Sequence, residues 1–163
     1  MRRTEIRNEI ERLAKEFRKG IEKAYFDMKF TDYPFCHFPK DCCDDASILL
    51  GQYLINNGYK CKLVRGNYYE DYYENNQKYL VRYNHIWIII DEIYVDITAD
   101  QFINDKSFIS VSDYLYPCYV GFSNKFYDSF DSIKTEEFTG INNYNYFERN
   151  RLKKLYNTIC SYI

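Results

Sequence analysis

The stretch NHIWIIIDEIYVDIT, residues 84–98, carries the strongest structural signal in this chain of 163 residues. Two apolar runs rich in β-branched residues flank Asp91-Glu92, a pattern that predicts two strands joined by a tight turn. The predicted pairs are Ile90 with Ile93, Ile88 with Val95 and Trp87 with Asp96. This register places His85 and Asp96 on one face of the hairpin, along a diagonal that a long side chain can span. A slip of one residue would move them to opposite faces.

The flanking sequence predicts helices and further strands. Apolar residues that recur every three or four positions indicate an amphipathic helix over residues 4–28 and a second helix over residues 42–57, with Asp41 as its N-cap. Strands are predicted over residues 60–66, 77–90 and 93–98, and a terminal helix over residues 144–163. The order of helix, helix, strands and helix favours an α+β fold, in which an antiparallel sheet packs against helices on one side.

Two connections have unusual sequences. Residues 29–40 contain two prolines and several aromatic residues, which predict an ordered loop. Residues 66–79 are dense in tyrosine, and they fit either a wide hairpin loop or a mobile flap that closes over a site. After residue 103 the periodicity weakens until the terminal helix. A chain of this length predicts a single domain over residues 1–163.

Charge and composition argue against several classes of partner. The chain has 22 Lys and Arg against 24 Asp and Glu, a net charge of −2 that disfavours nucleic acid. No apolar run approaches the roughly 18 residues of a membrane span, so we expect no membrane partner. The N-terminal residues lack the pattern of a secretory signal. The six cysteines are therefore expected to be reduced, in a cytoplasmic protein.

Cys42 is the first candidate for chemistry. It begins a predicted helix, and the free N–H groups and dipole at a helix N-terminus favour the thiolate, the nucleophilic form of cysteine. Neighbouring carboxylates such as Asp44 act in the opposite direction. Cys43 is a rival, because helical geometry places the two thiols on opposite edges of the apolar face and does not choose between them.

Three segments in this order and spacing resemble the transglutaminase-like superfamily of papain-type cysteine enzymes, including bacterial members. The segments are FPKDCCDDASILLGQYLINNGYKCKLVRG (residues 38–66), HIWIII (residues 85–90) and YVDITADQF (residues 94–102). They span residues 38–102, which the resemblance makes the enzyme core. Residues 1–30 then form an N-terminal amphipathic helix, and residues 103–163 form a C-terminal extension that ends in a helix.

The resemblance assigns individual residues. Its Cys-x-Asp-x-Ala pattern matches Cys42 with Asp44 and Ala46, and so selects Cys42 over Cys43. Its His-x-Trp pattern gives His85, and its aspartate after the next strand gives Asp96. The chain departs from the superfamily at two positions: Lys40 stands where glycine is frequent, and Ile86 stands where alanine is common.

The chemistry that the resemblance implies is acyl transfer. Cys42 would attack an amide or thioester carbonyl, His85 would take the thiol proton and return it to the leaving group, and Asp96 would orient the imidazole. The backbone N–H of Cys42 would help to hold the oxyanion. Hydrolysis of a peptide or protein substrate, by a peptidase or deamidase, is favoured over transfer to an amine, and no cofactor or metal is implied.

Two other functions compete with this one. A catalytically inactive transglutaminase-like fold could act as a protein-binding module through its tyrosine-rich segment, residues 68–73. Alternatively, four side chains could bind zinc, although adjacent pairs suit a tetrahedral site poorly. These are Cys36, His37, Cys42 and Cys43. The sequence also leaves open whether His37 lines the catalytic site.

Overall fold

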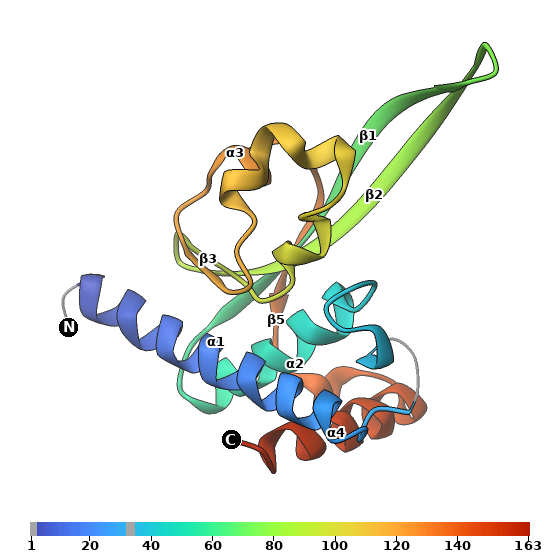
Figure 1. Ribbon diagram of the computed structural model, residues 1–163. Helices are drawn as coiled ribbons and strands as arrows, with labels where there is room; N and C mark the ends of the chain where they lie inside the picture. Colours follow the sequence, from blue (N-terminus) through green and yellow to red (C-terminus); the bar gives the residue numbers. More distant parts are fainter. Residues whose placement is uncertain (1–2, 32–34) are drawn as a thin grey trace.

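The computed structural model describes residues 3–31 and 35–163, without the side chains of residues 132 and 133. Five strands form one antiparallel sheet in the order β4-β3-β2-β1-β5. The strands are β1 (Cys61–Glu74), β2 (Gln77–Ile90), β3 (Ile93–Asp96), β4 (Tyr119–Gly121) and β5 (Asp131–Phe138). The predicted combination of helices with an antiparallel sheet is confirmed (Figure 1).

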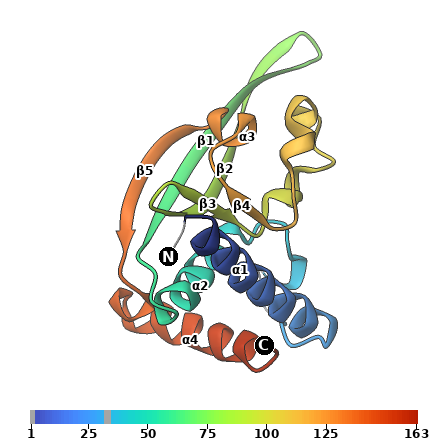
Figure 2. The ribbon, with the colours of Figure 1, turned by 90° about the vertical axis from the view of Figure 1, so that its left-hand side faces the viewer.

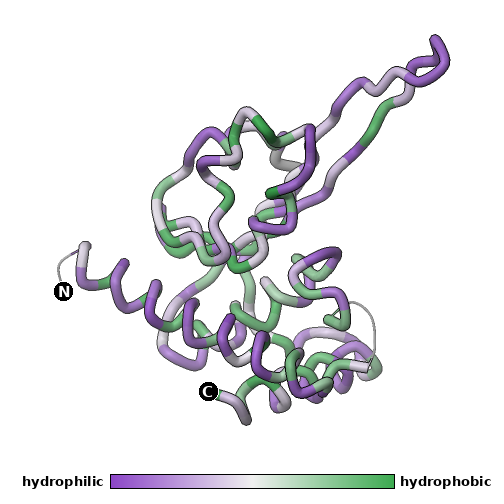
Figure 3. Tube along the Cα trace, in the orientation of Figure 1, coloured by the Kyte–Doolittle hydropathy of each residue, from purple (hydrophilic) through white to green (hydrophobic). Residues whose placement is uncertain are grey.

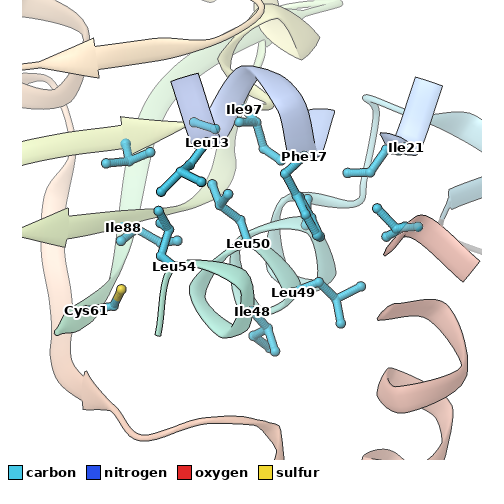
Figure 4. Close-up of a cluster of buried hydrophobic side chains, with 14 of the residues drawn as sticks. Leu13, Phe17, Ile21, Ile48, Leu49, Leu50, Leu54, Cys61, Ile88 and Ile97 are labelled. Atoms are coloured by element: carbon cyan, nitrogen blue, oxygen red, sulfur yellow. The ribbon is translucent and has the colours of Figure 1, made fainter. Parts of the chain in front are cut away.

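Three helices lie on one side of the sheet (Figure 2). Helices α1 (Arg3–Phe26) and α2 (Cys43–Asn56) pack against the strands, and α4 (Tyr146–Cys160) packs against α1 and α2. Apolar side chains of these helices meet alternate residues of the strands, since successive strand residues point to opposite faces. Leu50 and Leu54 of α2, for example, belong to the same buried cluster as Ile88 of β2 and Leu13 of α1 (Figure 4).

The opposite face is covered by residues 99–130, where the sequence gives only a weak signal. This segment contains short helices: η2 (Ala99–Phe102) and η3 (Lys106–Tyr114), both 3-10 helices, and α3 (Lys125–Asp128). They hold a second core rich in aromatic rings, here called the aromatic core, to which Trp87 of β2 belongs. The prediction of helices on one side alone is therefore incomplete, because short helical turns with aromatic contacts lack the period of an amphipathic helix.

The predicted hairpin at Asp91-Glu92 is confirmed. Ile88 pairs with Val95 and Ile90 with Ile93, so the register is the expected one. Asp91 takes a positive φ of 53°, a conformation that aspartate tolerates better than most residues.

The start of α2 differs from the prediction. Its N-cap is Cys42 rather than Asp41, and the cap makes no side-chain hydrogen bond to the helix. Asp41 instead adopts a left-handed conformation with φ of 56°, which turns the chain out of the loop and into the helix. This one-residue difference changes where each cysteine side chain lies.

The tyrosine-rich segment is not a loop. β1 and β2 continue as a regular two-stranded ladder as far as the pair Glu74–Gln77, closed by Asn75-Asn76 with φ of 51° and 61°. Two central residues with positive φ are the signature of the tight turn that best matches strand twist. The outer part of this hairpin, residues 68–83, is called the arm below. It projects from the rest of the chain (Figure 1), with hydrophilic residues at its tip and a hydrophobic stretch along β2 (Figure 3).

One further prediction concerns membranes. Within residues 3–31 and 35–163, none of the helices combines the length and the apolar character needed to cross a bilayer. The predicted loop at residues 29–40 lies partly outside the described residues, and its remaining part includes a short 3-10 turn, Phe35–His37.

Candidate active site

His85 lies in the aromatic core with no solvent exposure. Four rings surround its imidazole at centroid distances between 5.2 and 5.9 Å, namely those of Phe102, Trp87, Phe126 and Phe130. Gly66 is its partner on β1, and a Cβ there would come within 2.8 Å of the Trp87 ring. Glycine is therefore needed opposite His85, because a larger residue would displace the ring that borders the imidazole.

Asp96 fixes the imidazole. Its Oδ2 lies 2.5 Å from Nε2 of His85, so the diagonal predicted from the hairpin register is confirmed. The same oxygen accepts a bond of 3.1 Å from the Tyr127 hydroxyl, and Oδ1 accepts bonds from the Thr98 N–H and hydroxyl at 2.9 and 3.2 Å. A buried carboxylate with this many donors is held in one orientation. The sequence analysis did not find Tyr127 or Thr98.

The environment favours the charged forms of this pair. Burial opposes protonation of His85, but the attraction of the Asp96 carboxylate, supplemented by a hydrogen bond and charge from Cys43, raises the pKa of His85 to about 10. Burial likewise opposes ionisation of Asp96, yet His85 and the donors around the carboxylate lower its pKa. The imidazolium and the carboxylate thus stabilise each other inside the core.

Cys43 is the thiol that the structure brings to His85. It is the first helical residue of α2, is half-buried, and lies close enough to the imidazole to contribute to the raised pKa of His85. Residues four apart share one side of a helix, and Ser47 on this side donates a bond of 2.9 Å to the carbonyl of Ile86, next to His85. This bond fixes the N-terminus of α2 against β2. Because Asp96 occupies Nε2 of His85, Nδ1 is the ring nitrogen left for the thiol.

Cys42, the residue selected from the sequence, lies elsewhere. Its side chain has no solvent exposure and belongs to the core shared by α1 and α2, and its thiol donates a bond of 3.1 Å to the Pro39 carbonyl. Burial, reinforced by the charges of Cys43 and Asp45, raises the pKa of Cys42 well above its usual range. The geometry therefore points to Cys43, one residue later than the motif match. The signal that could have found it is the hydroxyl of Ser47, four residues further on.

The two carboxylates that follow Cys43 are both paired. Asp45 accepts two bonds of 2.6 Å from the guanidinium of Arg151 on α4. Asp44 forms an ion pair of 3.1 Å with Arg65 on β1. The sequence predicts that these aspartates oppose a thiolate, whereas in the structure each of them is paired with an arginine.

Gln101 connects His85 to a pocket. Its side-chain nitrogen lies 3.4 Å from Nδ1 of His85, on the side of the ring that faces away from Asp96. It also lines a pocket of about 510 Å³ between the loop that precedes α2 and residues 100–105. Tyr83 and Asp41 also line this pocket. Gln101 was not identified from the sequence, because a 3-10 turn after a strand carries no distinctive pattern.

Arg18 holds in place the pocket-lining segment that carries Asp100 and Gln101. Its guanidinium makes two bonds of 2.9 and 2.8 Å to the Asp100 carboxylate and donates to the carbonyls of Ile97 and Pro117. It also lies over the Phe38 ring, 5.0 Å from the centroid. One buried side chain of α1 therefore fixes both the segment that carries Gln101 and the loop before Cys42.

The other sequence-based candidates are distributed as follows. Cys36 is half-buried, and its neighbour His37 ends the 3-10 turn before α2. Within the described part of the chain, no group of three or more His, Cys, Asp and Glu side chains has an arrangement that could hold a metal. Of the tyrosines in residues 68–73, Tyr68 packs against the aromatic core, and the other three are exposed.

The comparisons with known proteins give no family. The chain was compared with protein-family models, curated proteins and solved structures, and none of them matches it.

Proposed function

We propose that this protein is a cysteine-dependent acyl-transfer enzyme with Cys43 as nucleophile, His85 as general acid and base, and Asp96 as the group that orients His85. The observation that carries the proposal is the buried His85–Asp96 pair beside Cys43, a thiol at the N-terminus of a helix that contributes to the raised pKa of His85. A nucleophile beside a base that is itself held by a third group is the arrangement that such catalysis requires. The order of cysteine, histidine and aspartate also fits the resemblance to the transglutaminase-like superfamily, while the proposed nucleophile stands one residue after the motif match at Cys42.

The proposed reaction runs in two stages. The Cys43 thiolate attacks the carbonyl carbon, a sulfur–carbon bond forms, and an electron pair moves to the carbonyl oxygen. When the electron pair on oxygen re-forms the carbonyl, the bond to the leaving group breaks, and the proton on Nδ1 of His85 passes to the leaving amine. Water then attacks the thioester, gives its proton to His85, and releases the acid and the thiolate.

We propose two donors for the oxyanion. The backbone N–H of Cys43 belongs to the first turn of α2, whose N–H groups have no acceptors within the helix. The second donor is the side-chain amide of Gln101, which lies beside Nδ1 and faces the pocket. Losing one such donor costs about 3–4 kcal/mol in well-studied enzymes. We favour transfer of the acyl group to water over transfer to an amine, because the sequence offers no recognisable site for a second substrate.

An acyl-enzyme assay tests the proposal. The wild-type protein is mixed with p-nitrophenyl acetate, and we expect a burst of nitrophenol together with a thioester on Cys43, located by peptide mapping. Cys42→Ala is the matched control, since it removes the neighbouring thiol and leaves Cys43 in place, and it should keep the burst. Cys43→Ala should abolish it. A burst that survives in Cys43→Ala, or a thioester on Cys42, would contradict the assignment.

A further inference from the structure

The arm leads to the proposed active site on one face. Opposite residues of an antiparallel pair share a face, and here the pairs are Tyr72 with Tyr79, Glu70 with Val81, Tyr68 with Tyr83 and Gly66 with His85. The sheet face that carries His85 therefore continues along the arm through every second residue pair. Tyr83, two residues before His85, also lines the 510 Å³ pocket that Gln101 borders.

The edges of the arm are open. β1 pairs with β5 only over Cys61–Asn67, and β2 pairs with β3 only over Ile88–Ile90. Within the described residues, the stretch of β2 from Gln77 to Trp87 thus has a strand neighbour on one side alone. Every second residue of such an edge turns its N–H and C=O outward. Because the closing turn makes Glu74–Gln77 a hydrogen-bonded pair, the outward residues of β2 are Lys78, Leu80, Arg82 and Asn84.

The arm holds exposed apolar surface without packing partners. Leu80 and Tyr73 are each 65% exposed, and Tyr72 is 51% exposed. A two-stranded ribbon alone in water is marginally stable, and an open edge of this length invites another strand. Charge on the arm is mixed, as the Lys78–Asp71 ion pair shows, which gives no basic surface for nucleic acid. An extended polypeptide is the partner that satisfies the backbone groups of such an edge.

We propose that an extended segment of the polypeptide substrate adds as a strand to the outer edge of β2 and so reaches the pocket beside Gln101. This inference rests on the proposed function, since it names the substrate class of the Cys43–His85 site. A substrate chain that follows the edge of β2 from Gln77 past Tyr83 arrives at the pocket. The arm of a second copy of the protein would cover the same edge but would bring no substrate to the Cys43–His85 site. Main-chain pairing gives affinity without a sequence requirement at each position.

The test compares proline with alanine at the outward positions. Binding of fluorescein-labelled, reduced and carboxymethylated α-lactalbumin, a permanently unfolded chain, is measured by fluorescence anisotropy in the Cys43→Ala background. We expect Leu80→Pro with Arg82→Pro to weaken binding at least tenfold, because each proline removes an outward N–H. Leu80→Ala with Arg82→Ala removes the same side chains, keeps both N–H groups and should bind within about twofold of the parent.

Other outcomes would overturn the proposal. The proposal fails if the Cys43→Ala parent does not bind the labelled polypeptide. It also fails if the proline pair and the alanine pair bind it equally well, or lose binding to the same extent. A dimer that dissociates in the proline pair, with no change in polypeptide binding, would assign the edge to a second copy. Should the proline pair fail to fold, deletion of residues 71–74 and 77–80 keeps the ladder in register, with Glu70 opposite Val81, and must also abolish binding.

The outcome for the arm is separable from the outcome for the chemistry. The binding measurement uses a protein without the nucleophile, so it does not depend on catalysis. In proteins that retain Cys43, the rate at which iodoacetamide modifies this thiol should be the same with and without the proline pair. If Cys43 of the wild-type protein reacts no faster than an ordinary thiol, the proposed function fails. A positive binding result would then leave the edge of β2 as a polypeptide-binding surface.

Discussion

At the scale of the residue, the position of each side chain in the first turn of a helix decides its chemistry. Cys42 and Cys43 are neighbours in sequence, yet the first is buried against Pro39 and the second reaches His85. The difference arises because Cys42 is the N-cap, with φ of −118°, and lies outside the helix that Cys43 begins. A motif match cannot resolve such a shift when two identical residues are adjacent.

Asp96→Asn should impair both activity and stability. The amide can donate to Nε2 of His85 and would then favour the wrong tautomer for accepting a proton from Cys43, so we expect a loss of about 10²–10⁴-fold in kcat/KM. Removing one charge of a buried pair also costs roughly 3 kcal/mol of the free energy of unfolding. Steady-state kinetics and urea denaturation measure the two effects. Activity within threefold of wild type would exclude a role for Asp96 in orienting His85.

At the scale of the element, α2 positions the thiol through contacts at its N-terminal turns. Ser47 fastens the helix to β2, and Arg151 of α4 binds the Asp45 carboxylate with two bonds. The C-terminal helix thus takes part in the electrostatics of the candidate site, although the sequence presents it only as an amphipathic element. Long-range partners of this kind cannot be read from periodicity, because it predicts which face is buried and not what lies opposite.

Arg151→Met tests this connection. It leaves the buried carboxylate of Asp45 without its guanidinium, which should lower the free energy of unfolding by about 2 kcal/mol. The uncompensated negative charge close to Cys43 should also slow alkylation of that thiol severalfold at neutral pH. Lys153→Met removes an exposed cation from the same helix and is the matched control, and neither quantity should change there. Equal alkylation rates in the two variants would show that the Asp45–Arg151 pair does not influence the thiol.

At the scale of the whole molecule, the sheet separates two cores of different composition. The core with α1, α2 and α4 follows the periodic pattern, and these three helices were predicted within a few residues. The aromatic core around His85 depends on residues 99–130, whose short turns were not predicted. The hairpin register could be predicted because a two-residue turn fixes it, whereas Gln101, Tyr127 and the arm required tertiary structure.

The buried His85–Asp96 pair predicts a pH dependence of stability. The pKa of His85 is raised to about 10 in the folded protein, against about 6.5 when unfolded. Its stabilising contribution is therefore complete below about pH 6.5 and is lost as the pH rises toward 10. We expect the free energy of unfolding to fall between pH 6.5 and 8.5, before tyrosines titrate, and His85→Gln to show a flatter profile. If the free energy of unfolding of the two proteins depended on pH in the same way, His85 would not be a protonated, buried imidazolium at neutral pH.

Competitive alkylation tests the central claim most directly, because all six cysteines are present in one native protein. Iodoacetamide is added in limiting amount at pH 6.5, and the modified residue is located by mass spectrometry in the wild type and in His85→Ala. We predict that Cys43 is modified first and at least tenfold faster than the half-buried Cys36 and Cys118, and that His85→Ala removes this advantage. Modification of Cys42 first, or a rate for Cys43 equal to those of Cys36 and Cys118, would contradict the Cys43–His85 assignment.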